Sequence, residues 1–177
     1  MMRSRSSAPA SGTVAYISVM TALSAIIGYL EMLIPVSFFG LPGVKLGLAN
    51  IVSLIALYMF GPVYAFLIMT VRVILLGFMF GNMYSILYGL MGGFLSITVM
   101  ILLKRTNLFT MTGVSAAGGV FHNMGQLCAA GLTLKGLRLY YYIPVLIIAG
   151  LICGCITGIL STIIEGRIGE QERQGYK

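Results

Sequence analysis

Long apolar segments, separated by short breaks of charge, proline or glycine, fill most of this sequence. A helix needs about 20 mostly apolar residues to cross the roughly 30 Å hydrocarbon core of a membrane. The pattern predicts six transmembrane helices, over residues 14–34, 45–60, 63–80, 83–103, 113–133 and 141–164. Together they form a single domain over 14–164, with short tails at 1–13 and 165–177.

Composition agrees with this pattern, because 59% of the 177 residues are hydrophobic, only 8% are charged and aspartate is absent. Such a chain is not an ordinary soluble domain, and we expect an all-α integral membrane protein that crosses the plasma membrane several times. The net charge of +7 then reflects topology and contact with anionic lipids, and we expect no nucleic-acid partner.

Basic residues in the connections predict the orientation of the six helices. Cytoplasmic segments carry an excess of Lys and Arg. With the N-terminus inside, seven basic residues are cytoplasmic: Arg3, Arg5, Lys104, Arg105, Arg167, Arg173 and Lys177. Three are outside: Lys45, Lys135 and Arg138. The chain therefore predicts an N-in, C-in topology with both tails in the cytoplasm.

The fifth predicted helix carries a polar face within residues 118–126. At about 100° per residue, Gln126 lies about 40° and Asn123 about 100° from His122, and Ser115 lies about 20° from it. Two glycines of the range are on the same side, and the opposite side is apolar. Polar side chains inside a membrane need a partner, so this face is expected to point into the protein.

Arg72 falls near the middle of the third predicted helix. An arginine at that depth is unfavourable by roughly 2.5–3.5 kcal/mol on insertion scales. Glu31 is about 12 Å nearer the outside at 1.5 Å per residue, so we interpret it as solvated and expect Arg72 to extend toward the polar face of the fifth helix. A second interpretation stays open, in which backbone carbonyls and amides satisfy a purely structural Arg72.

Polar side chains gather in the outer part and the middle of the predicted bundle, at Glu31, Lys45, Asn50, Arg72, His122, Asn123 and Gln126. The inner halves of the helices carry almost none. This predicts a cup that opens outward, is closed by apolar packing toward the cytoplasm, and captures a small ligand with an anionic group. A channel would need polar lining at both ends. All seven residues except Glu31 are predicted to bind substrate.

The first predicted helix carries a strip of small side chains at Ser18, Thr21, Ala22 and Ala25. Spacings of three and four residues place them on one face, where another helix can approach closely. The strip serves either packing within this chain or docking of another membrane subunit. Glycines repeat at four-residue spacing at 89 and 93, and at 150, 154 and 158, which predicts close packing within the bundle.

Chemistry beyond binding has little support in the sequence. The three cysteines, with one histidine and no aspartate, indicate neither a structural metal site nor a disulfide framework. A nucleophilic pair would lack an orienting carboxylate, and a Gly-rich phosphate loop is missing. We therefore expect no enzyme activity, no metal and no cofactor.

Several motifs together resemble one known family. They are Pro42-Gly-Val-Lys-Leu-Gly-Leu-Ala-Asn50, Arg72, Gly92-Gly93, and His122-Asn-Met-Gly-Gln126 followed by Tyr-Ile-Pro144. They resemble the Gx transporter family, also labelled heptaprenyl diphosphate synthase component I, over almost all of residues 14–164. That family is similar to the S components of energy-coupling factor (ECF) transporters.

The resemblance implies both a fold and a role. S components have six helices, bind a vitamin or micronutrient from outside, and associate with a transmembrane T component and two ATPases. They often dock through an Ala-x-x-x-Ala strip on the first helix, whose nearest matches here are Ser18-x-x-x-Ala22 and Thr21-x-x-x-Ala25. The chain is thus expected to be a substrate-binding subunit for a vitamin-like or precursor molecule.

The synthase label can be compared with the residues present. Prenyl-chain elongation needs magnesium held by aspartate-rich motifs, and this chain has no aspartate. Catalysis is therefore not expected. The alternative function is a non-catalytic membrane component of an isoprenoid, quinone or flavin-linked redox system.

Overall fold

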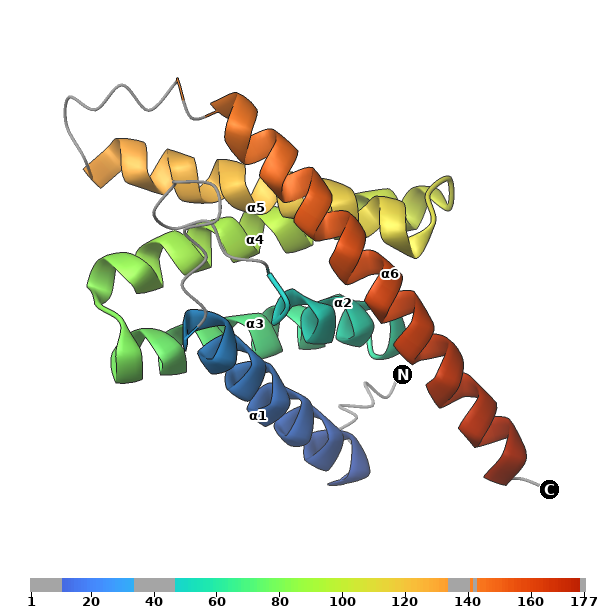
Figure 1. The fold of residues 1–177 in the computed structure, drawn as a ribbon. Helices are drawn as coiled ribbons and strands as arrows, with labels where there is room; N and C mark the ends of the chain where they lie inside the picture. The colour runs from blue at the N-terminus through green and yellow to red at the C-terminus, as the bar shows by residue number, and fades with distance from the viewer. Residues whose placement is uncertain (1–10, 34–46, 134–140, 142, 176–177) are drawn as a thin grey trace, which may run out of the picture.

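The computed structural model describes residues 11–33, 47–133, 141 and 143–175. These residues form six α-helices (Figure 1): α1 Ser11–Leu33, α2 Asn50–Met59, α3 Pro62–Phe80, α4 Met83–Thr106, α5 Met111–Thr133 and α6 Ile143–Gly175. Four of them, α1, α3, α4 and α6, are long and apolar enough to cross a membrane. The all-α class and the multi-pass membrane character are confirmed.

Successive helices run in opposite directions. The connections from α2 to α3 and from α4 to α5 lie at one side of the bundle, on the right of Figure 1, and the connection from α3 to α4 lies at the other. Asn82 starts α4 by accepting a hydrogen bond from the backbone N–H of Ser85 at 2.9 Å. Asn107 ends α4 in a left-handed conformation, with φ of 55°.

Helix α2 is shorter than expected. It begins at Asn50, whereas the prediction placed its start at Lys45, which lies outside the described residues. The chain turns before the helix, with Gly47 at φ 74° and its carbonyl accepting from the N–H of Asn50 at 2.8 Å. Ten residues extend about 15 Å at 1.5 Å each. Residues 51–57 are all buried, so surrounding protein covers this helix.

Helix α6 is longer than expected. It continues to Gly175, although the prediction ended the sixth helix at residue 164 and began a tail at 165. The part that is apolar enough to span a membrane stops at Ile168. The apolar pattern therefore located the membrane segment approximately, but it could not locate the end of the helix, since charged residues continue a helix readily in water.

Glycines set the contacts of α5 with its two neighbours. A Cβ atom on Gly119 would overlap the backbone oxygen of Gly150 in α6, and one on Gly125 would come within 2.6 Å of the Met91 oxygen in α4. The helices therefore touch backbone to backbone, as small residues allow. Close packing by the glycines of α6 is confirmed, and so is that by the α4 glycines 89 and 93, which meet α3 side chains.

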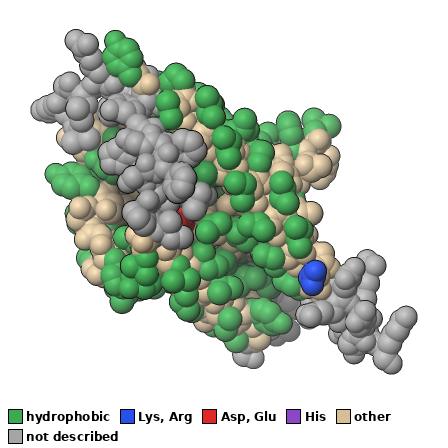
Figure 2. All heavy atoms as spheres, in the orientation of Figure 1, with side chains coloured by type: hydrophobic (Ala, Val, Ile, Leu, Met, Phe, Trp, Pro, Cys, Tyr) green, Lys and Arg blue, Asp and Glu red, His purple; other side chains and the backbone are tan. Residues whose placement is uncertain are grey.

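The outer surface is largely apolar. Figure 2 shows hydrophobic side chains over most of the described part of the visible face, with a basic group near one end. Large apolar residues on α1, α3, α4 and α6 are more than a third exposed, among them Leu23, Phe78 and Ile148. In water such an extended apolar surface would be unfavourable, whereas lipid tails cover it at little cost.

Candidate ligand-binding site

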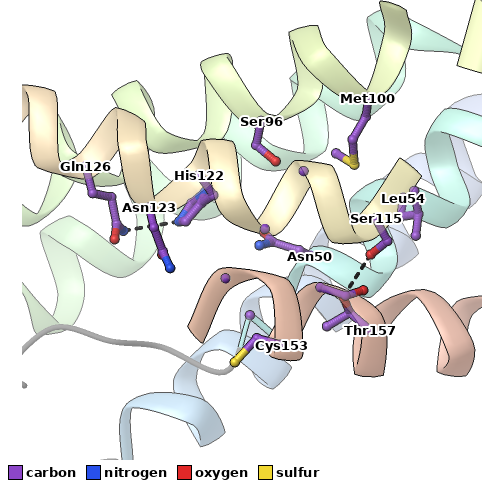
Figure 3. A pocket seen from close by; sticks show the side chains of 15 residues that line it. Asn50, Leu54, Ser96, Met100, Ser115, His122, Asn123, Gln126, Cys153 and Thr157 are labelled. Atoms are coloured by element: carbon purple, nitrogen blue, oxygen red, sulfur yellow. Dashed lines mark hydrogen bonds between the residues drawn. The ribbon is translucent and has the colours of Figure 1, made fainter. Parts of the chain in front are cut away.

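The polar face of α5 lines a cavity, called the first cavity below, between α2, α4, α5 and α6 (Figure 3). The α5 residues of its lining are those placed on one face by the helical spacing: Ser115, Gly118, Gly119, His122, Asn123 and Gln126. The cavity offers about 40 Å³ for the centres of water-sized molecules, where a single water needs about 10–15 Å³. The predicted inward direction of this face is confirmed.

The first cavity continues further toward the α4–α5 connection than the predicted cup. Near that end it is lined by the hydroxyls of Ser96, Ser115 and Thr157. The Ser115 and Thr157 hydroxyls lie 2.9 Å apart and join α5 to α6 (Figure 3). This end of the cavity is therefore more polar than the predicted apolar closure, and Ser115 and Thr157 satisfy one another across two helices.

A second cavity lies beside the first, between α1, α3, α4, α5 and the turn before α2. It offers about 70 Å³ by the same measure. Four residues line both cavities: Gly47, Asn50, His122 and Gln126. The two spaces therefore meet at a wall of two carboxamides and one imidazole, and the second cavity alone contains charged side chains.

Arg72 reaches this wall from α3. Its side chain is 8% exposed and lines the second cavity. Its Nη2 donates to the Asn50 Oδ1 at 2.9 Å, and its Nε has no hydrogen-bond partner among the described residues. The guanidinium group therefore contacts one neutral amide, and it also faces the second cavity. As expected, Arg72 lines a cavity together with His122 and Gln126 of α5, but its hydrogen bond goes to Asn50 of α2. A bond to an amide also agrees with the second, structural interpretation, so both interpretations of Arg72 stay predictions.

Glu31 lines the same second cavity and is not solvated, contrary to expectation. It is 5% exposed, and its Oε1 accepts a hydrogen bond from the backbone N–H of Gly47. The turn before α2 therefore contacts the carboxylate near the end of α1. Among the described residues no ion pair joins Glu31 to Arg72. The sequence feature that could have indicated burial of Glu31 is its position at the end of a long apolar segment.

The remaining predicted substrate-binding residues differ in their contacts. The Gln126 and His122 side chains lie 3.1 Å apart through their Nε2 atoms (Figure 3). Asn123 lines the first cavity, and its Nδ2 donates to the Leu146 carbonyl of α6 at 2.8 Å. Asn123 therefore joins helices as well as facing the cavity. The sixth predicted residue, Lys45, lies outside the described residues.

Comparison with known proteins places these features in a family. The family model described as heptaprenyl diphosphate synthase component I matches residues 20–164. No curated protein and no solved structure matches the chain. The matched range contains every residue that lines the two cavities. The chain therefore belongs to the heptaprenyl diphosphate synthase component I family.

Proposed function

We propose that this protein is a substrate-binding membrane subunit, like an S component, of an ECF-type transporter. It captures a small vitamin-like or precursor molecule with an anionic group from outside the cell. The supporting observation is Arg72, a nine-tenths buried cation that lines the second cavity. Among the described residues it has one neutral hydrogen-bond partner, Asn50, and its Nε has none. Arginine presents a planar fork that suits a carboxylate or phosphate.

In this proposal each polar group has a distinct task. Arg72 pairs with the anion, and Lys45 adds a second positive charge that attracts it. Asn50, His122, Asn123 and Gln126 donate or accept hydrogen bonds. In this proposal both ends of the chain are in the cytoplasm, and the charged second cavity faces the outside. The chain itself is not an enzyme, and a T component with ATPases would drive uptake.

The small-residue strip of α1 supports docking of such a partner. Ser18 and Ala22 are exposed, and Thr21 and Ala25 are half-buried. The Ser18 hydroxyl donates to the Val14 carbonyl at 2.9 Å, and that of Thr21 to Ile17 at 2.8 Å. Both hydroxyls are therefore satisfied within α1, so the strip presents a shallow surface without unmet polar groups to another helix.

Ala22→Trp should prevent association with the T component and leave ligand binding within about twofold of wild type, since the indole would hold the partner helix away. The matched control is Leu23→Trp, which alters another exposed side chain of the same helix about 100° away. Co-purification with tagged T component and ATPases measures the effect. Equal recovery of both variants would leave packing within the chain as the role of the strip.

The alternative function is a non-catalytic component of an isoprenoid, quinone or flavin-linked redox system. The description of the family supports a link to isoprenoid metabolism. This alternative predicts a stable protein partner and no saturable binding of a small molecule. The sequence lacks the aspartates that would hold magnesium for prenyl transfer, so the alternative remains a non-catalytic one.

Native mass spectrometry of the detergent-purified protein tests the proposed function, with extracted small molecules identified from the same sample. A stoichiometric vitamin-like or precursor molecule would support a capture site. A co-purifying redox or isoprenoid protein, with no small molecule bound, would favour the alternative.

A further inference from the structure

The second cavity contains two opposite charges that do not meet. Glu31 and Arg72 are 5% and 8% exposed, and both line this space. Oppositely charged groups in a protein interior normally pair directly, because isolated buried charges are costly. Here the described residues contain no ion pair between them, so the two groups face the cavity as separate positive and negative positions.

One short turn keeps the two charges in their places. The backbone N–H of Gly47 donates to the Glu31 carboxylate, and the Asn50 side chain three residues later accepts from Arg72. Each charged group is thus bound to a neutral group of the same turn. Gly47 has φ 74°, a conformation that favours glycine. The turn from Gly47 to Asn50 therefore contacts both charged groups.

We propose that the captured molecule is a zwitterion, whose anionic group binds Arg72 and whose positively charged nitrogen binds Glu31. This inference rests on the proposed function and narrows its substrate class. A ligand with an anion alone would neutralise Arg72 but would place a second negative charge near Glu31, which is unfavourable where water is scarce. A zwitterion satisfies both groups and leaves the cavity neutral.

The uncharged part of the molecule has a place in the first cavity. The two spaces meet at Asn50, His122 and Gln126, so a ligand held by its charges in the second cavity extends past the amides and the imidazole. Beyond them are the hydroxyls of Ser96 and Thr157 among apolar side chains. Such a lining suits a compact body with a few polar atoms.

The test separates the charge of Glu31 from its role in the fold. Glu31→Gln removes the charge and keeps an oxygen that can accept from Gly47. Glu165→Gln, in the charged end of α6, is the matched control. The probe is the small-molecule fraction of a cell extract, incubated with purified protein. Bound molecules are identified by native mass spectrometry, and the released molecule is also N-acetylated, which removes its positive charge.

We expect the bound molecule to carry an acid and a basic nitrogen, and to bind Glu31→Gln at least 10-fold more weakly than wild type or Glu165→Gln. N-acetylation should weaken binding to wild type at least 10-fold and leave binding to Glu31→Gln nearly unchanged. If Glu31→Gln does not fold, the comparison of the acetylated and unmodified molecule on wild type tests whether the positive charge contributes to binding.

Two other results would overturn the inference and are distinguishable. A bound molecule that is only anionic, with equal affinity for wild type and Glu31→Gln, would contradict the zwitterion inference and leave the proposed capture function in place. Folded wild-type protein that retains no molecule from the extract removes both proposals.

Discussion

Arg72→Ala is expected to weaken ligand binding about 30-fold or more, since losing one partner of a buried charge pair costs about 2–5 kcal/mol and 1.4 kcal/mol is a factor of ten. The fold should persist. The Arg72 side chain makes one hydrogen bond among the described residues, to Asn50, and a buried arginine opposes insertion. Titration with the molecule identified from wild type measures affinity, and circular dichroism with size-exclusion elution reports folding.

The matched control for this prediction is Arg105→Ala, which removes an exposed cation at the end of α4 and should leave affinity unchanged. Arg72→Lys should lie between wild type and Arg72→Ala, since lysine keeps the charge and loses the planar fork. If purified Arg72→Ala is unfolded while Arg105→Ala is intact, Arg72 has a structural role and the capture site loses its main support.

Gly119→Ala is expected to lower the Tm of the detergent-purified protein by about 2–12 °C. The added methyl group would overlap the backbone oxygen of Gly150, and a backbone atom cannot rotate away as a side chain can. Overpacking costs about 1–3 kcal/mol, and each kcal/mol corresponds to about 2–4 °C in a chain of this size. Loss of helical signal on heating, followed by circular dichroism, measures the change.

Gly113→Ala is the matched control on the same helix. A Cβ atom there would meet its nearest neighbour at 3.6 Å, an ordinary contact. Alanine also favours the helix over glycine by about 1 kcal/mol. Its Tm should equal or exceed that of wild type. The same Tm for both variants would show that α5 and α6 can separate at Gly119 without cost, against the contact described above.

The sequence predicted helix positions well where residues that start helices mark the boundaries. The predicted segments 63–80 and 83–103 correspond to α3 and α4 within three residues at each end, because Pro62 and Asn82 begin helices by known local chemistry. Helix α2 was less predictable. Its apolar composition extends before residue 50, and only the backbone conformation of Gly47 shows where the helix begins.

The candidate site was predictable in part. Helical spacing alone placed His122 and Gln126 on one face, and the cost of a buried cation directed Arg72 toward polar partners. Glu31 was misplaced because its depth was reckoned along a straight helix. The rise per residue contains no information about the turn at Gly47, whose backbone N–H donates to the carboxylate. Roles in binding and docking stay predictions.

The glycine contacts distinguish a more rigid part of the bundle, α4–α6, from a part in which the helices can shift more easily, α1–α3. At Gly125, between α4 and α5, and at Gly119, between α5 and α6, the nearest obstructing atoms belong to the backbone, although Gly118 of α5 meets the side chain of Met100. Across α3–α4 the obstructing atoms are side chains, such as Ile86 against Gly77 and Met69 against Gly93, which can change rotamer. We therefore expect helices α4–α6 to act as a fixed frame, and α1–α3, which carry both charges, to act as the gate through which the ligand exchanges.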